Sequence, residues 1–304
     1  MDGTRFVFTG LFLSLLLNAQ AASLRLSDDQ PLQLPPVGSY QLRILAPTLL
    51  ELTLITTKKP DSAQLEAWDF VDAQGQCRLP ESKDLVVMAG DKSVPVKALG
   101  FKRRVLYAPF KQRDLRIGNY LYLQLATPVP DNQMVEVKDP SRKLWPPALQ
   151  FSAKAEPLRW SPALHLNQTG YLPAYPKKAM VGYYLGSLGE MDLPQALAAP
   201  PVTNAPTLTF QILEAQSSKQ VFQGPLTLRP DRGFPFESYQ HVLEADFSSL
   251  KTPGQYRLLV PGLGTSFAFF IDDAVAGAFA RTYALGLYHQ RCGTENALPF
   301  TRFT

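Results

Sequence analysis

Alternating apolar and polar positions predict that the first half of the chain consists of short β-strands. Residues 40–56 alternate on both sides of Pro47, which predicts two strands with the proline at the break, because proline cannot donate a ladder hydrogen bond. Further strand-like stretches, separated by Gly, Pro, Asp and Asn, cover residues 84–89, 94–101, 104–108, 119–125 and 134–138. Seven or so strands in about 130 residues predict a β-sandwich domain over residues 23–155.

A second group of strands follows a proline-rich passage at residues 144–147 and 155–162, where prolines cannot supply regular ladder donors. We place a domain boundary near residue 156. The strands beyond it are expected at residues 179–185, 207–213, 220–223, 239–245, 254–260 and 266–271, with a hairpin turn at Gly262-Leu-Gly264 between the last two. They predict a second β-sandwich over residues 156–271. Residues 186–206, which hold several prolines, are expected to form a surface insertion in it.

One helix is expected near the end of the chain. Residues 274–291 contain no proline and are rich in Ala, Leu and Tyr, and Asp272 and Asp273 precede them as residues able to cap a helix N-terminus. Apolar side chains populate nearly every face of this helix, so it needs partners on several sides. Because the short stretch after residue 291 cannot cover it, we expect residues 272–304 to be the start of a third, helical domain.

The first residues have the three-part layout of a secretory signal. Arg5 is followed by an apolar run over residues 6–17 and then by Ala19-Gln-Ala21, which predicts residues 1–21 as a signal peptide cleaved after Ala21. An uncleaved anchor is the alternative, but a bilayer needs about 20 apolar residues and the run is shorter. We therefore expect a soluble mature protein that is secreted or periplasmic and has no membrane segment.

Composition and charge exclude some classes of protein. Proline (27) outnumbers glycine (19), which argues against an all-helical chain because proline interrupts helices. The net charge is only +4, and the densest basic cluster, Lys102-Arg103-Arg104, is interpreted as a solvated strand edge, so nucleic acid is not an expected partner. Cys77 and Cys292 belong to no CxxC pair, and no disulfide framework or complete thiolate zinc site can be assigned.

No residue of the chain is assigned a catalytic, cofactor-binding or metal-binding role. His165, His241 and His289 match no catalytic spacing and are interpreted as structural. Asp272 and Asp273 are interpreted as capping residues and not as an acid–base pair. Gly262-Leu-Gly264 lacks the helix and further glycine of a phosphate loop, and the sequon Asn167-Gln-Thr169 is common by chance.

Three segments together resemble a known enzyme family. Residues 164–181 begin with Leu164-His-Leu-Asn-Gln-Thr-Gly-Tyr-Leu-Pro173, which is similar to the opening of the immunoglobulin-like domain that precedes the catalytic domain of glycoside hydrolase family 9, the cellulases and endoglucanases. Residues 253–260 are similar to the closing strand of that domain. Residues 283–293 resemble the first helix of the family's (α/α)6 barrel with its Gln-Arg-Cys-Gly end. The resemblance does not extend to residues 23–155, which are expected only to form an extra β-sandwich.

The resemblance implies a fold and a function for the parent protein. The expected architecture is mainly β, with two tandem immunoglobulin-like sandwiches followed by the first helix of an incomplete (α/α)6 barrel. The implied chemistry is inverting hydrolysis of β-1,4-glucosidic bonds in cellulose or related β-glucans, by an aspartate base and a glutamate acid. Both residues would lie beyond Thr304, so the chain alone is expected to be inactive. A structural zinc or calcium would belong to the catalytic domain, where Cys292 resembles one zinc ligand of some members.

Two other functions stay open from the sequence. One is a carbohydrate-binding or adhesion module without enzymatic activity, in which Trp68, Trp145 or Trp160 would stack on sugar rings. The alternative is a structural role, in which these tryptophans fill the sandwich cores or seal the linker. The other function is a structural spacer. The exact polysaccharide, the role of residues 23–155 and the oligomeric state cannot be obtained from the sequence.

Overall fold

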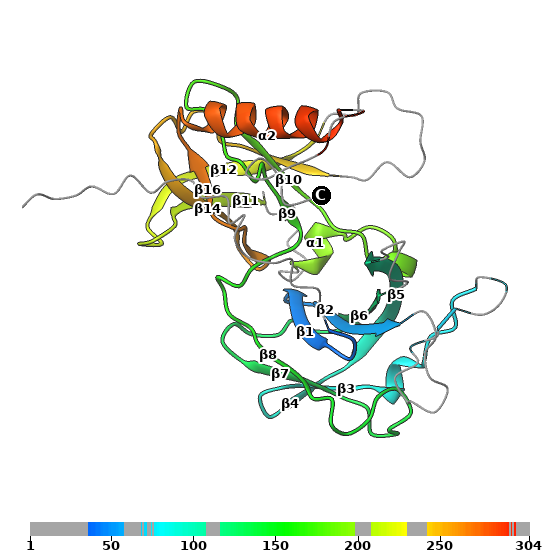
Figure 1. The fold of residues 1–304 in the computed structure, drawn as a ribbon. Helices are drawn as coiled ribbons and strands as arrows, with labels where there is room; N and C mark the ends of the chain where they lie inside the picture. The colour runs from blue at the N-terminus through cyan, green and yellow to red at the C-terminus, as the bar shows by residue number, and fades with distance from the viewer. Residues whose placement is uncertain are drawn as a thin grey trace, which may run out of the picture. The chain divides into compact units, whose positions relative to one another are not determined.

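The computed structural model describes residues 36–57, 68–107, 116–197, 208–229 and 242–295, apart from positions 69, 72, 73, 75, 292 and 294 (Figure 1). These residues belong to one compact unit, residues 34–304. The predicted signal peptide, His241 and Cys292 lie outside the described residues. The described part is mainly β, as the alternating pattern predicts.

Residues 40–154 form two antiparallel sheets of four strands each. In the first, the order is β1-β2-β6-β5, with bounds Tyr40–Ala46, Leu49–Thr57, Arg116–Leu125 and Val96–Tyr107. In the second, the order is β4-β3-β7-β8, with bounds Lys92–Val94, Val86–Ala89, Met134–Lys138 and Phe151–Lys154; the 3-10 turn η1 (Ser82–Asp84) precedes β3. The predicted break at Pro47 is confirmed, since it separates β1 from β2.

A single hydrophobic core lies between these two sheets. Leu50, Leu52 and Leu54 alternate along β2 with their side chains in this core, and β7 contributes Val135 and Val137. The aromatic centre consists of Trp68, Trp145 and Phe151, whose ring centroids lie 4.9–6.2 Å apart. The period of two along the strands thus places one face of each sheet in the core.

The strand boundaries differ from the sequence prediction most clearly around Pro95 and Gly100, and the short strands β8, β9 and β15 were not predicted. The two strands expected at residues 94–101 and 104–108 are one strand, β5, and β4 is a separate short strand before Pro95. Gly100 does not interrupt β5, since it pairs with Tyr122 of β6. The position requires glycine for another reason, because a Cβ there would lie 2.5 Å from Cγ of Leu188. Gly100 therefore marks a close approach to another segment and not the end of a strand.

The second β region is a larger antiparallel arrangement. Its strand order is β15-β14-β11-β12-β13-β10-β9, and β16 also pairs with β14. The bounds in chain order are β9 Leu164–His165, β10 Lys178–Val181, β11 Thr209–Glu214, β12 Gln220–Leu228, β13 Leu243–Asp246, β14 Gly254–Val260, β15 Gly264–Thr265 and β16 Phe269–Ile271. The predicted turn at Gly262-Leu-Gly264 is confirmed, and both glycines have φ in the left-handed region, +85° and +106°.

The expected surface insertion is wrong for the residues that the structure describes. Residues 186–197 form the 3-10 turn η2 (Gly186–Leu188) and the short helix α1 (Leu193–Ala196), and Met191, Leu193 and Ala196 are buried. Their side chains belong to a core cluster that also holds Leu45, Leu49 and Tyr122 of the first β region. The prolines suggested a loop, but the apolar residues on either side of Pro194 pack between the two β regions. Residues 198–206 lie outside the described part.

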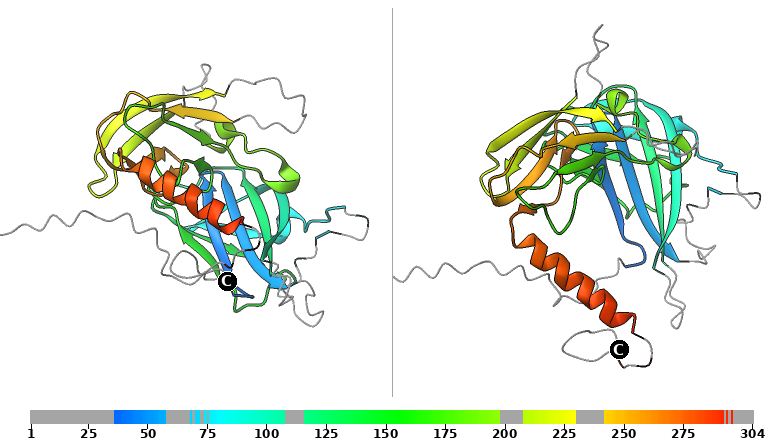
Figure 2. Two further views of the ribbon diagram at one scale, coloured as in Figure 1. Left: turned by 45° about the horizontal axis from the view of Figure 1, so that its top comes forward. Right: turned by 90° about the horizontal axis from the view of Figure 1, so that it is seen from above.

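The predicted helix is confirmed as α2 (Val275–His289), drawn in red in Figure 2. Ala274 occupies the N-cap position, and the Asp272 carboxylate accepts a hydrogen bond from the Ala274 N–H at 2.7 Å. Asp272 therefore acts on the turn before the helix and does not cap its first turn. No helix in the described part of the chain is long and apolar enough to cross a membrane.

Candidate functional site

The residues considered for hydrolytic chemistry are not brought together. His165 lies on β9, with Nε2 2.9 Å from the Gly182 carbonyl oxygen, and His289 lies in the last turn of α2. The Asp272 carboxylate is used in the turn before α2. Cys77 is a free, exposed cysteine. Among the described residues, no group of three or more His, Cys, Asp or Glu side chains lies close enough to hold a metal ion.

The segment that carries the family resemblance is a tightly packed corner of the second β region. Gly170 has a φ of +114°, and a Cβ there would lie 2.6 Å from the Phe270 carbonyl oxygen. The Tyr171 ring packs edge-on against Phe247 and Phe269, and its hydroxyl donates to the Lys178 carbonyl oxygen at 2.8 Å. This corner joins the opening of the domain to the strand that leads into α2. Close packing therefore explains the glycine and the tyrosine of the motif.

A buried lysine completes this corner. Lys177 is fully buried, and its ammonium donates to the carbonyl oxygens of Pro173 and Tyr175, each at 2.8 Å. Burial lowers the pKa of Lys177. The two carbonyls provide the partners that a buried cation requires, and the lysine thereby holds the loop that follows Tyr171.

The tryptophans divide into two groups. Trp68 and Trp145 are buried in the core of the first β region, so neither presents a ring face for stacking on a sugar, and for these two the core interpretation is confirmed. Trp160 is about half exposed (51%), and the Arg43 guanidinium lies 5.1 Å from its ring centroid. Trp160 is therefore the one tryptophan with an accessible ring, and Arg43 covers one of its faces.

A buried carboxylate lies where the two β regions meet. Glu51 of β2 is fully buried, accepts a hydrogen bond from the Arg43 guanidinium, and accepts another from the Tyr183 hydroxyl at 2.8 Å. Tyr183 follows β10, so this carboxylate joins the two regions directly. Burial, reinforced by the negative charge of Glu51, raises the pKa values of Tyr183 and of the neighbouring Tyr122. Both tyrosines are therefore neutral at physiological pH; Tyr183 donates to Glu51, whereas the buried Tyr122 hydroxyl has no hydrogen-bond partner among the described residues.

Lys102 lies in the same junction. Its ammonium is 4.6 Å from the ring centroid of Tyr183, is also close to the rings of Tyr120 and Tyr122, and donates to the Tyr184 carbonyl oxygen at 3.1 Å. Burial lowers the pKa of Lys102, and Glu51 opposes that shift. The solvated strand edge expected for residues 102–104 is therefore wrong for Lys102. β5 is an edge strand, but Lys102 packs against aromatic rings.

Backbone contacts reinforce the junction. The Thr48 hydroxyl donates to the Ala196 carbonyl oxygen at 3.0 Å, and the Phe101 N–H donates to the Ser187 hydroxyl at 3.0 Å. Arg159 donates to the carbonyl oxygens of Ile44 and Gly262. Residues 155–162, the part of the proline-rich passage at the expected domain boundary, are thus held on both sides. The junction is a packed interface that fixes the second β region, and the strand leading into α2, against the first.

Most of the surface of α2 is uncovered. Val275 is its one buried residue, and Tyr283 and Leu287 are 71% and 68% exposed. Val275 packs near Gly170, where an added Cβ would lie 3.0 Å from Val275 Cγ2. An apolar helix in water forgoes the stabilisation that burial of its large side chains provides. The free surface of α2 is therefore a candidate contact surface.

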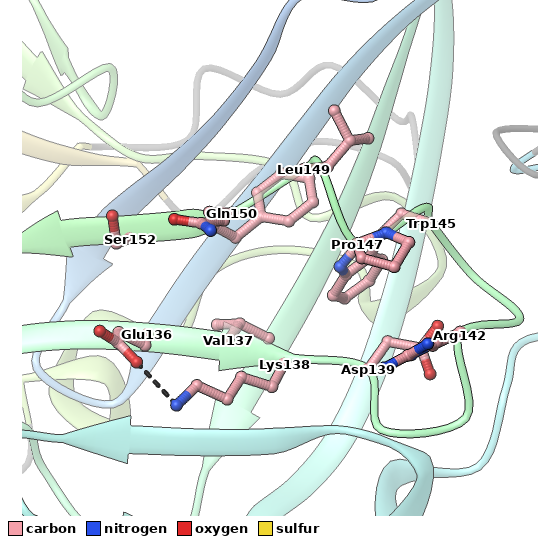
Figure 3. A pocket seen from close by; sticks show the side chains of 11 residues that line it. Glu136, Val137, Lys138, Asp139, Arg142, Trp145, Pro147, Leu149, Gln150 and Ser152 are labelled. Atoms are coloured by element: carbon pink, nitrogen blue, oxygen red, sulfur yellow. Dashed lines mark ion pairs between the residues drawn. The ribbon is translucent and has the colours of Figure 1, made fainter.

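A cavity of about 390 Å³ opens on the first β region, beside β7 and β8 (Figure 3). Its lining comprises Glu136, Val137, Lys138, Asp139, Arg142, Trp145, Pro147, Leu149, Gln150, Phe151 and Ser152. The volume falls within the range of about 300–1,000 Å³ that is usual for small-molecule sites. The sequence pattern gives no sign of this cavity, because most of its lining comes from the loop between the two strands.

Asp139 holds that loop in place. Its carboxylate accepts hydrogen bonds from the Ser141 N–H and hydroxyl, at 3.1 and 2.6 Å, and from the Leu144 N–H at 2.7 Å. Burial alone would raise the pKa of Asp139, but these hydrogen bonds outweigh it and lower the pKa. The bonds therefore favour the charged form of the carboxylate.

Asp139→Asn is expected to lower the free energy of unfolding by about 1–2 kcal/mol at pH 7, since charge-assisted hydrogen bonds are lost. Because the pKa of Asp139 is lower in the folded than in the unfolded state, its contribution is present above the unfolded value of 3.8 and is lost as the pH falls through the folded value. Urea unfolding at pH 7 and at about pH 3 should therefore show a smaller difference in the free energy of unfolding between wild type and variant at the lower pH. A difference that is the same at both pH values would contradict this assignment.

Comparison with known proteins identifies the second β region. Residues 159–265 match the family model described as the cellulase N-terminal ig-like domain. These residues include the Gly170–Tyr171 corner and the junction segment at residues 186–197. The chain therefore contains a cellulase-type immunoglobulin-like domain. The resemblance to glycoside hydrolase family 9 proteins with such an N-terminal domain is confirmed.

Curated relatives agree with this assignment. The chain is 26% identical over 193 residues to endoglucanase D of Acetivibrio thermocellus, an alignment that covers 64% of this chain and 24% of that protein. A second endoglucanase D of Acetivibrio thermocellus is 30% identical over 132 residues, or 43% of this chain and 17% of that protein. The chain thus spans about a quarter or less of the length of these relatives.

Solved structures of family 9 proteins match over a similar share of the chain. A metagenome-derived glycoside hydrolase family 9 endoglucanase is 30% identical, with a TM-score of 0.34, over 45% of this chain and 23% of that one. A family 9 protein of Bacteroides ovatus is 28% identical, with a TM-score of 0.29, over 42% of this chain and 18% of that one.

Proposed function

We propose that this chain is the N-terminal, non-catalytic part of an exported glycoside hydrolase that cleaves β-1,4-glucosidic bonds in cellulose or related β-glucans. The parent would be an inverting, endoglucanase-type enzyme of polysaccharide catabolism. Its general base and acid would lie beyond Thr304, together with any structural zinc or calcium. The 304 residues alone would then be inactive and would contact the polysaccharide only through the catalytic domain.

The uncovered α2 helix is the observation that carries this proposal. It directly follows the immunoglobulin-like domain and exposes Tyr283 and Leu287 to water. An apolar helix that has no partner on most sides is suited to be the first helix of a helical barrel. The immunoglobulin-like domain, fixed on the first β region through Glu51, Lys102 and Arg159, would brace that barrel.

The coding sequence downstream of Thr304 provides the direct test. The proposal expects a helical domain with paired acidic motifs there, and release of reducing sugar from soluble cellulose by the complete product but not by residues 1–304. A downstream sequence without such a domain, or hydrolysis by residues 1–304 alone in the presence of added metal, would refute it. N-terminal sequencing of secreted material should return a start near Ala22 if the protein is exported as proposed.

Removing the exposed part of α2 should improve solubility with little effect on the β regions. A chain that ends after Ala276 keeps Val275, the one buried residue of the helix, and is expected to have a melting temperature close to that of the whole chain. A chain that ends after Ile271 also loses Val275 and should be less stable by about 1.5–3 kcal/mol, the contribution of one buried large aliphatic side chain. Scanning calorimetry measures both. Unfolding of the β regions on the first truncation would show that α2 belongs to their core.

A further inference from the structure

The cavity beside β7 and β8 has features of a built ligand site. Trp145, which lines it, is 4% exposed, and its indole N–H has no hydrogen-bond acceptor within the part of the chain that the structure describes. Within the described residues, the one fully buried side-chain polar atom without a partner is the Tyr122 hydroxyl, so the Trp145 N–H is reached by solvent. The Trp145 N–H is therefore a donor that is open to an acceptor in the cavity.

The charges on the lining cancel. Glu136 and Lys138 form an ion pair, with Oε2 2.9 Å from Nζ. The Asp139 carboxylate is occupied by the loop's own donors, and Arg142 adds one positive charge to the same loop. Two carboxylates and two cations leave no net charge, so the cavity offers neither a phosphate nor an ammonium group a dominant counter-charge. A neutral ligand fits this balance best.

The remaining groups suit a molecule with both hydroxyl and C–H surfaces. The side chains of Gln150 and Ser152 are exposed at the cavity and form no hydrogen bonds within the described residues, so the amide and hydroxyl are free to donate and accept. Pro147 and Leu149 provide apolar contact on the same loop, as Figure 3 shows. A sugar ring has hydroxyls at its edge and C–H groups on its faces, which matches this pairing of polar and apolar surface.

We propose that this cavity is a binding site for a neutral oligosaccharide, held by hydrogen bonds to Trp145, Gln150 and Ser152 and by contact with Pro147 and Leu149. The site differs from the stacking platform considered from the sequence. Trp145 contributes its N–H and not its buried ring face, and Trp160 takes no part. Only the choice of a β-1,4-glucan as the first probe rests on the proposed function; the proposal for the cavity does not.

Calorimetric titration of the whole 304-residue chain tests the site. The probes are cellotetraose, xylotetraose and maltotetraose as neutral ligands, and tetragalacturonate as an anionic one. At least one neutral tetrasaccharide should bind at millimolar concentration or below. Gln150→Ala and Ser152→Ala, both surface changes, should each weaken that binding about three- to tenfold, as expected for one lost hydrogen bond. Gln255→Ala on the exposed side of β14 is the matched control and should change nothing.

A spectroscopic readout locates the ligand independently. Binding should shift the tryptophan emission, and the shift should persist in Trp160→Phe and disappear in Trp145→Phe. If Trp145→Phe proves unstable, the Gln150 and Ser152 variants still decide the outcome. Binding that is lost in Trp160→Ala but unchanged in Gln150→Ala and Ser152→Ala would overturn the cavity as the site.

The remaining outcomes also separate the two proposals. Binding of tetragalacturonate alone would overturn the neutral ligand class, and no binding of any probe would overturn the site itself. Binding of xylotetraose or maltotetraose without cellotetraose would support the cavity and count against the β-1,4-glucan in the proposed function. Absence of hydrolytic activity in the complete product would refute the proposed function without affecting the cavity.

Discussion

Glu51→Ala is expected to lower the free energy of unfolding by about 2–4 kcal/mol, one of the two largest effects predicted for this protein. The carboxylate is fully buried and joins Arg43 of the first β region to Tyr183 of the second. Its removal leaves the Tyr183 hydroxyl and the half-buried Lys102 without their negative partner. We expect a smaller destabilisation than for breaking a completely buried ion pair, because the Arg43 side chain is 23% exposed and can be hydrated.

The cooperativity of unfolding is a second readout for this variant. Since one core cluster contains Leu49 and Tyr122 together with Leu193 and Phe210, the two β regions of the wild type should unfold in one transition. Glu51→Ala should broaden that transition or split it in scanning calorimetry. Glu156→Gln is the control. Glu156 is exposed, and its Oε1 lies 4.0 Å from Lys154 Nζ, which makes a weak surface ion pair, so this change should have no measurable effect. Equal stability of Glu51→Ala and wild type would mean that the carboxylate is not structurally required.

Gly186→Ala is expected to destabilise the same junction by about 2–5 kcal/mol, from overpacking together with a left-handed backbone. Gly186 has a φ of +62°, and a Cβ there would lie 2.0 Å from the Phe101 carbonyl oxygen. That oxygen belongs to the backbone of β5 and cannot turn aside as a flexible side chain would. The turn η2 would have to move away from β5, and the hydrogen bond from the Phe101 N–H to the Ser187 hydroxyl would be lost.

Gly38→Ala separates the two causes. Gly38 also has a left-handed φ, +85°, but a Cβ there would meet no atom within 4 Å. It should therefore lose only about 1–2 kcal/mol from backbone strain. Urea unfolding of both variants measures the difference, which reports the close approach of η2 to β5. Similar losses in the two variants would show that η2 can move from β5 without a penalty.

Local patterns in the sequence predicted most of the secondary structure. The break at Pro47 and the hairpin turn at Gly262-Leu-Gly264 depend on proline and glycine, and the helix at Val275–His289 on a proline-free run rich in Ala and Leu; these effects act within a few residues. The Asn167-Gln-Thr-Gly-Tyr segment resembles the opening of a known domain, and the structure gives a reason for its glycine, since a Cβ at Gly170 would lie 2.6 Å from the Phe270 carbonyl oxygen. The class of the second domain could therefore be identified before its structure was known.

The junction could not be found in this way. Lys102 has the pattern of a solvated strand residue, and Glu51 is a single charge in an alternating strand, yet both are covered by a segment more than 80 positions away in sequence. The prolines at residues 194–206 suggested a surface insertion, whereas the side chains of Met191 and Leu193 fill the interface. Burial at a contact between distant segments depends on which of their faces meet, and local periodicity does not predict which faces these are.

The sequence by itself therefore determined most of the strands, the hairpin turn, the apolar helix and the type of the domain predicted for residues 156–271, because these depend on local backbone chemistry and on a recognisable motif. Only the tertiary structure decided that Trp68 and Trp145 are buried and Trp160 is not, that Glu51 and Lys102 lie in a packed junction, and that a cavity opens beside β7 and β8. These features arise from long-range packing, in which the faces that meet decide which polar side chain is buried with a partner and which stays open to a ligand.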